Sequence, residues 1–452
     1  MRGYLRHMTE RDILIPVMLL LLGFGTFFSR YAAMVLLYCA LFPAAFASMG
    51  RELPKTNGRR DRTPLAALIC CCVLAALLLL NDMRGGDWKN VVSLTVPFLV
   101  CLLVLLQPPA EFSVKDVRRG TERFGAGLIL LFLPLELLGL YCLFSDRVIT
   151  LPLADGVIGV EHSGTLWDRL QILSHPNNVG QYAVFSLVFC LYFFRRLKKP
   201  ALRAGLALAM AVHVVILAHV QSRNDTTAAA LSVMLFVFFT GRESKRLSRK
   251  RGGTAAAALL AAAAGILLYL VIEWVYKLDM SCLRGMSVRD ISTRSDTYGA
   301  LDVVSTGRGA IWKWALGYFR AHPAKLLTGI GSDYYRIISS EFPIADTFRS
   351  LHSSFLSCLV LGGIPLLGCV AWLMLTLIRP VLTMLFTAER TEYRDLVIVP
   401  ILICAMFGMS LIESMLYINP YVNPCFQNLM FFTLCGYARA FEREHPCKGR
   451  KE

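Results

Sequence analysis

Long runs of apolar residues alternate with short polar or basic stretches along almost the whole chain. A run of about 20 apolar residues can cross the roughly 30 Å hydrocarbon core of a membrane as an α-helix. Inside lipid each segment has to satisfy its own backbone hydrogen bonds, so helices are the expected form. The pattern therefore predicts an all-α polytopic membrane protein with about twelve transmembrane helices.

The chain is expected to form a single membrane domain over residues 1–452, with no internal repeat. The first predicted span follows basic residues, as a signal peptide would, but no small-residue cleavage site follows it, and we treat it as an anchor. The predicted spans are Ile13–Ser29, Tyr31–Met49, Leu65–Leu80, Val91–Leu106, Phe124–Phe144, Val179–Phe194, Gly205–Val220, Thr227–Phe239, Thr254–Val275, Ser354–Ile378, Leu396–Leu416 and Pro424–Phe441.

Basic residues indicate the orientation of these spans. Dense Lys and Arg clusters follow spans two, four, six and eight and end the chain, and cytoplasmic loops are the ones enriched in such residues. Both termini are therefore expected in the cytoplasm, in a multi-pass protein of the cytoplasmic (inner or plasma) membrane. The net charge of +16 is then mostly an orientation signal. No basic stripe interleaved with aromatic residues predicts a nucleic-acid partner.

One large polar segment, residues 276–352, lies between spans nine and ten on the extracytoplasmic side of this topology. From Arg308 to Ala321 its apolar residues recur at helical spacing, and Ser305 is a plausible N-cap. A second amphipathic stretch is expected from Asp333 to Phe342. Such helices suit either the membrane interface or packing on the bundle, and both interpretations place them over the outer membrane surface.

Three side chains near the expected outer surface combine permanent charge with proton-accepting ability. Arg223 lies in a very short link between two spans, Arg308 starts the predicted outer helix, and His352 lies at the mouth of span ten. A guanidinium binds phosphate with a planar fork and stays charged at every relevant pH. Histidine is well suited to take a proton from a hydroxyl near neutral pH. The set predicts two phosphate ligands and a general base.

Each of the three also has a plainer interpretation. Arg223 would be an interfacial arginine paired with Asp225, Arg308 a solvated surface arginine, and His352 a structural residue at a helix start. The sequence alone leaves these alternatives open.

Three further residues are candidates for lining a polar cavity, namely His175, Asn178 and Glu136. His175 and Asn178 lie where an outer loop re-enters the membrane, and Glu136 is costly in lipid unless it faces a cavity or a partner. No Cys and His spacing predicts a zinc site, and no Walker A loop, Gly-x-Gly-x-x-Gly or Asp-x-Asp pair is present. We therefore expect no metal and no cofactor, with an activated donor arriving through the membrane.

These residues converge on a family resemblance between Arg223 and Gly363. Ser222-Arg223 ends an outward-running span, Gly307–Trp312 is similar to a Gly-Arg-x-x-x-Trp segment, and His352-Ser353 with Gly363 is similar to a His-Asn/Ser/Gln…Gly motif. Asn177-Asn178 resembles a looser feature of the same family. The chain thus resembles the O-antigen ligase and polymerase-related membrane glycosyltransferases. Leu366 departs from the pattern, since ligases often carry Gly, Thr or Tyr there.

The resemblance implies a metal-independent, inverting transferase with a type-C glycosyltransferase-like fold. Its donor would be a glycan on undecaprenyl diphosphate, and its acceptor a sugar hydroxyl on a polysaccharide, on lipid A-core or on a protein glycan. Arg223 and Arg308 would bind the leaving diphosphate, and His352 would be the general base. Two other functions remain open: a transporter or flippase of lipid-linked saccharides, which should carry polar residues along a central path, and a non-catalytic scaffold.

Overall fold

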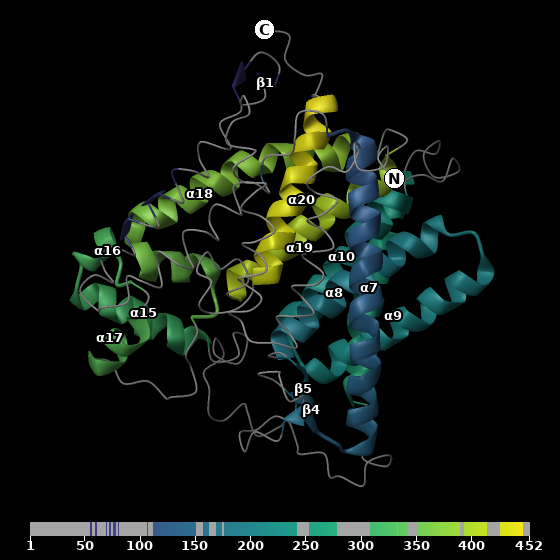
Figure 1. Ribbon diagram of the computed structural model, residues 1–452, viewed down its shortest axis with the longest axis horizontal. Coiled ribbons are helices and arrows are strands. Elements are labelled where there is room, and N and C mark those ends of the chain that lie inside the picture. The colour runs from purple at the N-terminus through teal and green to yellow at the C-terminus, as the bar shows by residue number, and fades with distance from the viewer. Residues whose placement is uncertain are drawn as a thin grey trace, which may run out of the picture.

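The computed structural model describes residues 112–150, 157–161, 169–173, 176–241, 253–277, 308–331, 333–341, 351–388, 393–413 and 425–445, with short pieces between 55 and 106. Within these residues the chain is mainly helical (Figure 1). The long helices are α7 (Val114–Ser145), α8 (Pro176–Arg196), α9 (Pro200–Val220), α10 (Arg223–Gly241), α12 (Gly253–Lys277), α18 (Ser354–Ala388), α19 (Ile398–Ile412) and α20 (Cys425–Glu444).

Every predicted span from Phe124–Phe144 onward corresponds to one of these helices. Among the described residues, five helical stretches are long and apolar enough to cross a membrane, in α7, α9, α12, α18 and the stretch that ends with α19. The two spans before Met49 lie outside the described residues, and only isolated residues of the next two are described. A helical membrane protein is therefore confirmed, while the count of twelve stays a prediction.

Local signals explain where several helices begin and end. Ser113 and Asp116 form a capping box at the start of α7, so two backbone donors of the first turn are satisfied. Pro200 begins α9, where its missing N–H costs nothing. Gln221, with φ of 55°, ends α9 in the left-handed conformation and turns the chain directly into α10.

Helices α8, α10 and α19 pack on one another, and their two ends carry most of the polar contacts described below. The interior is filled by large aromatic and aliphatic side chains, among them the fully buried Phe185 and Phe189 of α8. The ring of Phe124 on α7 stacks on Phe426 of α20, with centroids 6.0 Å apart. This close packing fixes the helix ends relative to one another, which is what a site built from several helices requires.

The described residues of the large polar segment form short helices beside α18 (Figure 1). They are α15 (Arg308–Ala321), α16 (Lys325–Thr328) and α17 (Tyr334–Glu341). The helix predicted over Arg308–Ala321 is confirmed at both ends, and α17 confirms the second amphipathic stretch. On the apolar face of α15, Ile311 and Ala315 are almost inaccessible and belong to the main hydrophobic core, while Leu316 is half exposed. Of the two interpretations, packing on the bundle therefore holds for the buried part of this face.

Gly329, next to α16, and Gly363, within α18, allow the backbones of these two helices to approach closely. The backbone of α18 leaves helical geometry at Gly362 and Gly363, and Gly363 has φ of 67°. An added Cβ at Gly363 would lie 2.5 Å from the Leu326 carbonyl oxygen, so a side chain there would push α16 away. Gly329 is equally constrained, with φ of 75° and the Leu361 carbonyl at 2.5 Å from an added Cβ. Close backbone approach therefore accounts for the glycine of the His352…Gly363 pattern.

A small antiparallel sheet was not expected from the sequence. Strands β3 (Ile149–Thr150), β4 (Val157–Glu161) and β5 (Arg169–Ile172) pair in that order, with Val160 opposite Leu170. They occupy the segment between α7 and α8 that was predicted only as a loop. A further two-residue pair joins β1 (Lys55–Thr56) to β2 (Arg59–Arg60). β5 does alternate polar and apolar residues, with Leu170 and Ile172 buried, but the signal is only four residues long, and β4 (VIGVE) shows no such alternation.

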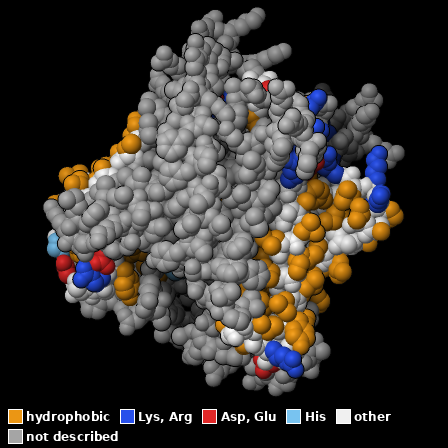
Figure 2. Space-filling model, in the orientation of Figure 1, with side chains coloured by type: hydrophobic (Ala, Val, Ile, Leu, Met, Phe, Trp, Pro, Cys, Tyr) orange, Lys and Arg blue, Asp and Glu red, His pale blue; other side chains and the backbone are white. Residues whose placement is uncertain are grey.

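Exposed apolar side chains mark the lipid-facing surface. Figure 2 shows them gathered along the flank formed by α9, with Lys and Arg side chains near its upper edge. On α9 and α12 the large exposed apolar side chains are Leu202, Leu208, Leu259, Leu260, Ile266, Leu267, Leu270 and Trp274. A soluble protein rarely exposes so large a continuous apolar surface, so this flank agrees with a place in a membrane.

Candidate active site

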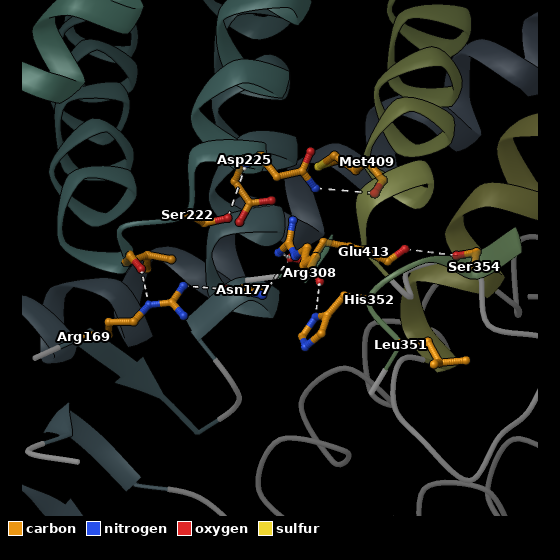
Figure 3. A network of polar contacts seen from close by, with 12 residues as sticks. Arg169, Asn177, Ser222, Asp225, Arg308, Leu351, His352, Ser354, Met409 and Glu413 are labelled. Atoms are coloured by element: carbon orange, nitrogen blue, oxygen red, sulfur yellow. Dashed lines mark hydrogen bonds and ion pairs between the residues drawn. The ribbon is translucent and has the colours of Figure 1, made fainter. Parts of the chain in front are cut away.

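The carboxylate of Glu413 is the centre of a polar network at one end of α8, α10 and α19 (Figure 3). It accepts hydrogen bonds from Arg308 Nη2 and from Asn177 Nδ2, the latter at 2.8 Å, and His352 Nδ1 lies 3.2 Å from its other oxygen. The Glu413 side chain is only 7% exposed. A buried carboxylate is costly unless it is paired, and here a guanidinium, an amide and an imidazole pair it.

Glu413 reaches this position because α19 ends there. It is the C-cap of the helix, with extended backbone angles, so its side chain leaves the helix axis and turns into the bundle. Its carbonyl oxygen accepts a hydrogen bond of 3.1 Å from Ser354 Oγ, the first residue of α18. The end of α19 is thus tied to the start of α18.

Arg308 is the first residue of α15, and its side chain is 12% exposed. The interpretation of Arg308 as a solvated surface arginine is therefore wrong. One turn later, Trp312 Nε1 donates a 2.9 Å hydrogen bond to the carbonyl oxygen of Leu351. The arginine and the tryptophan of the Gly307–Trp312 pattern thus act together: the first contacts Glu413, and the second holds the residue that precedes His352.

His352 lies just before α18 in a left-handed backbone conformation, with φ of 46°. Its side chain remains 24% exposed, so the imidazole is reachable from outside the network. The residue that caps α18 is the next one, since Ser353 Oγ accepts from the backbone N–H of Leu356 at 3.4 Å. The imidazole thus contacts Glu413, while Ser353 caps the helix.

Asn177 connects the network to the small sheet. Its amide oxygen accepts a 2.5 Å hydrogen bond from Arg169 Nη2, while Arg169 Nε donates to the carbonyl oxygen of Val220 at 2.7 Å. Arg169 is on β5, Asn177 is in the first turn of α8, and Val220 ends α9. The unpredicted sheet therefore supports Asn177, which donates to the same Glu413 oxygen as Arg308.

Asp225, near the start of α10, is a second carboxylate at the same end. It is fully buried, and neither carboxylate oxygen has a hydrogen-bond partner in the described part of the chain. Burial acts on it most strongly, followed by the neighbouring Ser222 hydroxyl, repulsion from Glu413, and attraction from Arg169 and Arg308. Gly180 lies against this carboxylate, since an added Cβ would overlap Asp225 Oδ2. The position is electrostatically coupled to the site and tightly enclosed.

The structure brings Arg308 and His352 together on one carboxylate and places Arg223 at the same end of the bundle. Arg223 is the first residue of α10, and its side chain is exposed. The next residue, Asn224, lies with its amide nitrogen 3.4 Å from the carbonyl oxygen of Met409, close to the end of α19. Because neither carboxylate oxygen of Asp225 accepts a hydrogen bond among the described residues, the alternative in which Arg223 pairs with Asp225 is not observed there.

The candidate cavity residues have different outcomes. His175 lies outside the described residues. Asn178 is half-buried in the first turn of α8, next to the Asn177 that contacts Glu413. Glu136 has found a partner within the bundle: its Oε2 lies 2.6 Å from His213 Nδ1, and both side chains are fully buried. A carboxylate within a membrane span was expected to face a cavity or a partner, and for Glu136 the structure shows a partner, His213 on α9.

Sequence reasoning missed the central residue of the site. The sequence does not single out Glu413, because nothing close to it along the chain marks it. Its partners come from α8 (Asn177), from α15 (Arg308) and from the segment before α18 (His352), and only folding brings them together. In the part of the chain that is described, no group of three or more His, Cys, Asp or Glu side chains forms a candidate metal site.

The comparison with known families agrees with this geometry. A sequence model of the O-antigen ligase family matches residues 214–371. The match begins in α9 and ends in α18, so it includes Arg223, Arg308, Trp312, His352 and Gly363. The chain therefore resembles this family over that segment, as its local patterns indicated. No curated protein matches the chain.

Proposed function

We propose that this protein is a membrane glycosyltransferase that moves a glycan from undecaprenyl diphosphate to a sugar hydroxyl of an acceptor. The reaction would take place at the outer face of the cytoplasmic membrane, in polymerisation or ligation of a surface polysaccharide. The observation that carries the proposal is the sharing of one buried carboxylate, Glu413, by a guanidinium and an imidazole. The family match over residues 214–371 supports the same class of activity.

In this proposal His352 is the catalytic base. A neutral imidazole that donates its Nδ1 hydrogen to Glu413 keeps the lone pair of Nε2 for a substrate proton. The acceptor oxygen attacks the anomeric carbon as its proton passes to Nε2, and the bond from that carbon to the diphosphate oxygen breaks. Glu413 stabilises the imidazolium that results. Attack opposite the leaving group inverts the anomeric configuration.

Arg308 and Arg223 take the departing diphosphate. A guanidinium carries five N–H donors, and the contact with Glu413 uses one nitrogen of Arg308, so other donors can meet phosphate oxygens. Both cations stay charged, and they stabilise the negative charge that develops on the leaving group. This electrostatic contribution requires no metal ion. Glu413 is a positioning residue here, because it acts on substrate only through Arg308 and His352.

The test is covalent transfer by the purified full-length protein. Lipid-linked glycan extracted from the source cells and an acceptor glycan are incubated with the protein, with and without EDTA. We expect a new glycosidic bond of inverted configuration, detected by mass spectrometry and NMR, at an unchanged rate in EDTA. If labelled lipid-linked glycan crosses sealed vesicles and no new bond forms, the protein is a transporter. If EDTA stops transfer and Mg²⁺ or Mn²⁺ restores it, the roles given to the two arginines are wrong.

A further inference from the structure

A second polar site lies at the other end of α8, α10 and α19. It is a cavity of about 220 Å³ whose charged lining consists of Arg118, Arg195, Arg196, Arg394 and Asp395. Arg195 and Arg196 end α8, whereas Asn177 at its start contacts Glu413. Since α8 has 21 residues, the two sites are separated by about 30 Å. The mechanism proposed above uses none of these residues.

The lining of this arginine cavity has an excess of positive charge. Asp395 accepts from Arg118 Nη2 at 2.7 Å and from Arg196 Nη1 at 2.8 Å. Among the described residues of the lining, four arginines against one aspartate give a formal charge of +3, and the nearby Glu122, which pairs with Arg196, reduces it to +2. Within this part of the chain the guanidinium groups therefore outnumber the carboxylates. An anion inside it would be attracted by the remainder.

The guanidinium groups are also held in place. Arg118 lies over the ring of Tyr393, with its Cζ 5.0 Å from the centroid, and Arg196 lies over Tyr192 at 5.4 Å. Stacking on aromatic faces and pairing with Asp395 fix both planes, so less entropy is lost when a ligand binds. Phe236 and Thr240 of α10 complete the wall, which places an apolar ring and a hydroxyl next to the charges.

We propose that the arginine cavity binds the phosphate group of an anionic ligand. Planar guanidinium forks match phosphate oxygens, and the cavity has a volume of about 220 Å³. A phospholipid headgroup and a free phosphate share this chemistry. The basic loops that follow predicted spans four and six place the cavity on the expected cytoplasmic side. The proposal does not depend on the transferase activity.

The test measures ligand binding to the full-length protein in a neutral detergent. Thermal unfolding and native mass spectrometry are recorded with phosphatidylglycerol, with phosphatidylcholine and with inorganic phosphate. The variants are Arg195→Gln and Arg394→Gln, and the control is Lys199→Gln. Lys199→Gln removes one positive charge, as the arginine variants do, just beyond α8. The Lys199 side chain makes no capping hydrogen bond at the start of α9. Midpoints without additive show whether each variant folds.

We expect phosphatidylglycerol, but not phosphatidylcholine, to raise the unfolding midpoint of the wild type. Each arginine variant should bind about 10-fold more weakly or worse, while Lys199→Gln behaves as the wild type. A rise with inorganic phosphate alone identifies a free anion as the ligand, and a rise confined to phosphatidylglycerol identifies a headgroup. Equal binding by the wild type and both arginine variants, or no binding of either anion, would overturn the proposal. Glycan transfer by folded Arg195→Gln protein distinguishes this outcome from failure of the proposed function.

Discussion

Each end of the bundle of α8, α10 and α19 carries one carboxylate that pairs with two side chains, but the side chains differ between the two ends. At one end Glu413 pairs with Arg308 and His352, and at the other Asp395 pairs with Arg118 and Arg196. Each carboxylate holds two cationic or basic side chains from distant parts of the chain. At the Asp395 end both partners are permanently charged. At the Glu413 end one partner can gain and lose a proton.

This difference indicates which end can carry out a reaction. A guanidinium attracts and orients an anion, but it does not accept a proton from a hydroxyl, because its pKa is above about 12. An imidazole does accept one near neutral pH. The arginine cavity is therefore suited to binding alone, and the Glu413 end to binding and proton transfer. Substitutions at the Glu413 end test this distinction.

Replacing the proton acceptor should have the largest effect. In His352→Asn the side chain tolerates the left-handed backbone at this position, so the fold is kept while the base is lost. We expect glycan transfer to fall by about 10²–10⁴, with lipid-linked donor accumulating in cells. His322→Asn is the control, because His322 is exposed and pairs with Glu341 away from Glu413. Normal product yield and length from His352→Asn would remove His352 from the mechanism.

Removing the charge of the central carboxylate should have the next largest effect. Glu413→Gln keeps the size of the side chain but no longer balances Arg308 or favours the protonated imidazole. We expect the rate constant for transfer to fall by roughly 10–100-fold, with a smaller change in donor affinity. Glu273→Gln makes the same change on the partly exposed surface of α12 and should leave the rate unchanged. Equal rates for both variants would show that Glu413 serves only the fold.

Replacing the exposed arginine should have a smaller effect. In Arg223→Lys the charge remains but the planar fork is lost, so we expect transfer to fall about 10-fold through weaker contact with the diphosphate. Arg320→Lys, at the exposed end of α15, is the matched control. Titration with donor lipid separates affinity from turnover. A fully active Arg223→Lys protein would favour an interfacial anchor over a phosphate ligand.

A change in packing should have the smallest effect, and mainly on stability. Gly180→Ala places a methyl group against the Asp225 carboxylate, and the resulting shift of α8 or α10 should cost about 1–3 kcal/mol. Gly205→Ala is the control, because an added Cβ there meets nothing within 4 Å. We expect a lower thermal midpoint in detergent for the first variant and an equal or higher one for the second. Equal midpoints would mean that α8 and α10 are less tightly joined than the structure indicates.

The sequence predicted the parts of this molecule that depend on local pattern. Apolar runs placed the helices from α7 to α20, and helical spacing placed α15 at its observed bounds. Short local patterns, Gly307–Trp312 and His352-Ser353, also identified Arg308 and His352, although the Glu413 that holds both side chains lies 105 and 61 positions away from them.

The sequence could not predict what depends on long-range contact. Glu413 has partners more than a hundred positions away, and Asn177 differs from its neighbour Asn178 only by the direction of its side chain at the start of α8. The sheet of β3, β4 and β5 carries the Arg169 that holds Asn177, but only the four residues of β5 alternate between polar and apolar, which is too short a signal to place a sheet. The arginines of the cavity belong to basic clusters that the sequence analysis interpreted only as a signal of membrane orientation, so no binding site was predicted there.

The most direct test of the shared carboxylate is a double-mutant cycle of His352→Asn and Glu413→Gln, measured as the rate of glycan transfer by purified protein. If Glu413 works by positioning the imidazole, its substitution should slow the His352→Asn protein by a much smaller factor than it slows the wild type. If Glu413→Gln slows both backgrounds by the same factor, the two side chains are not one catalytic unit.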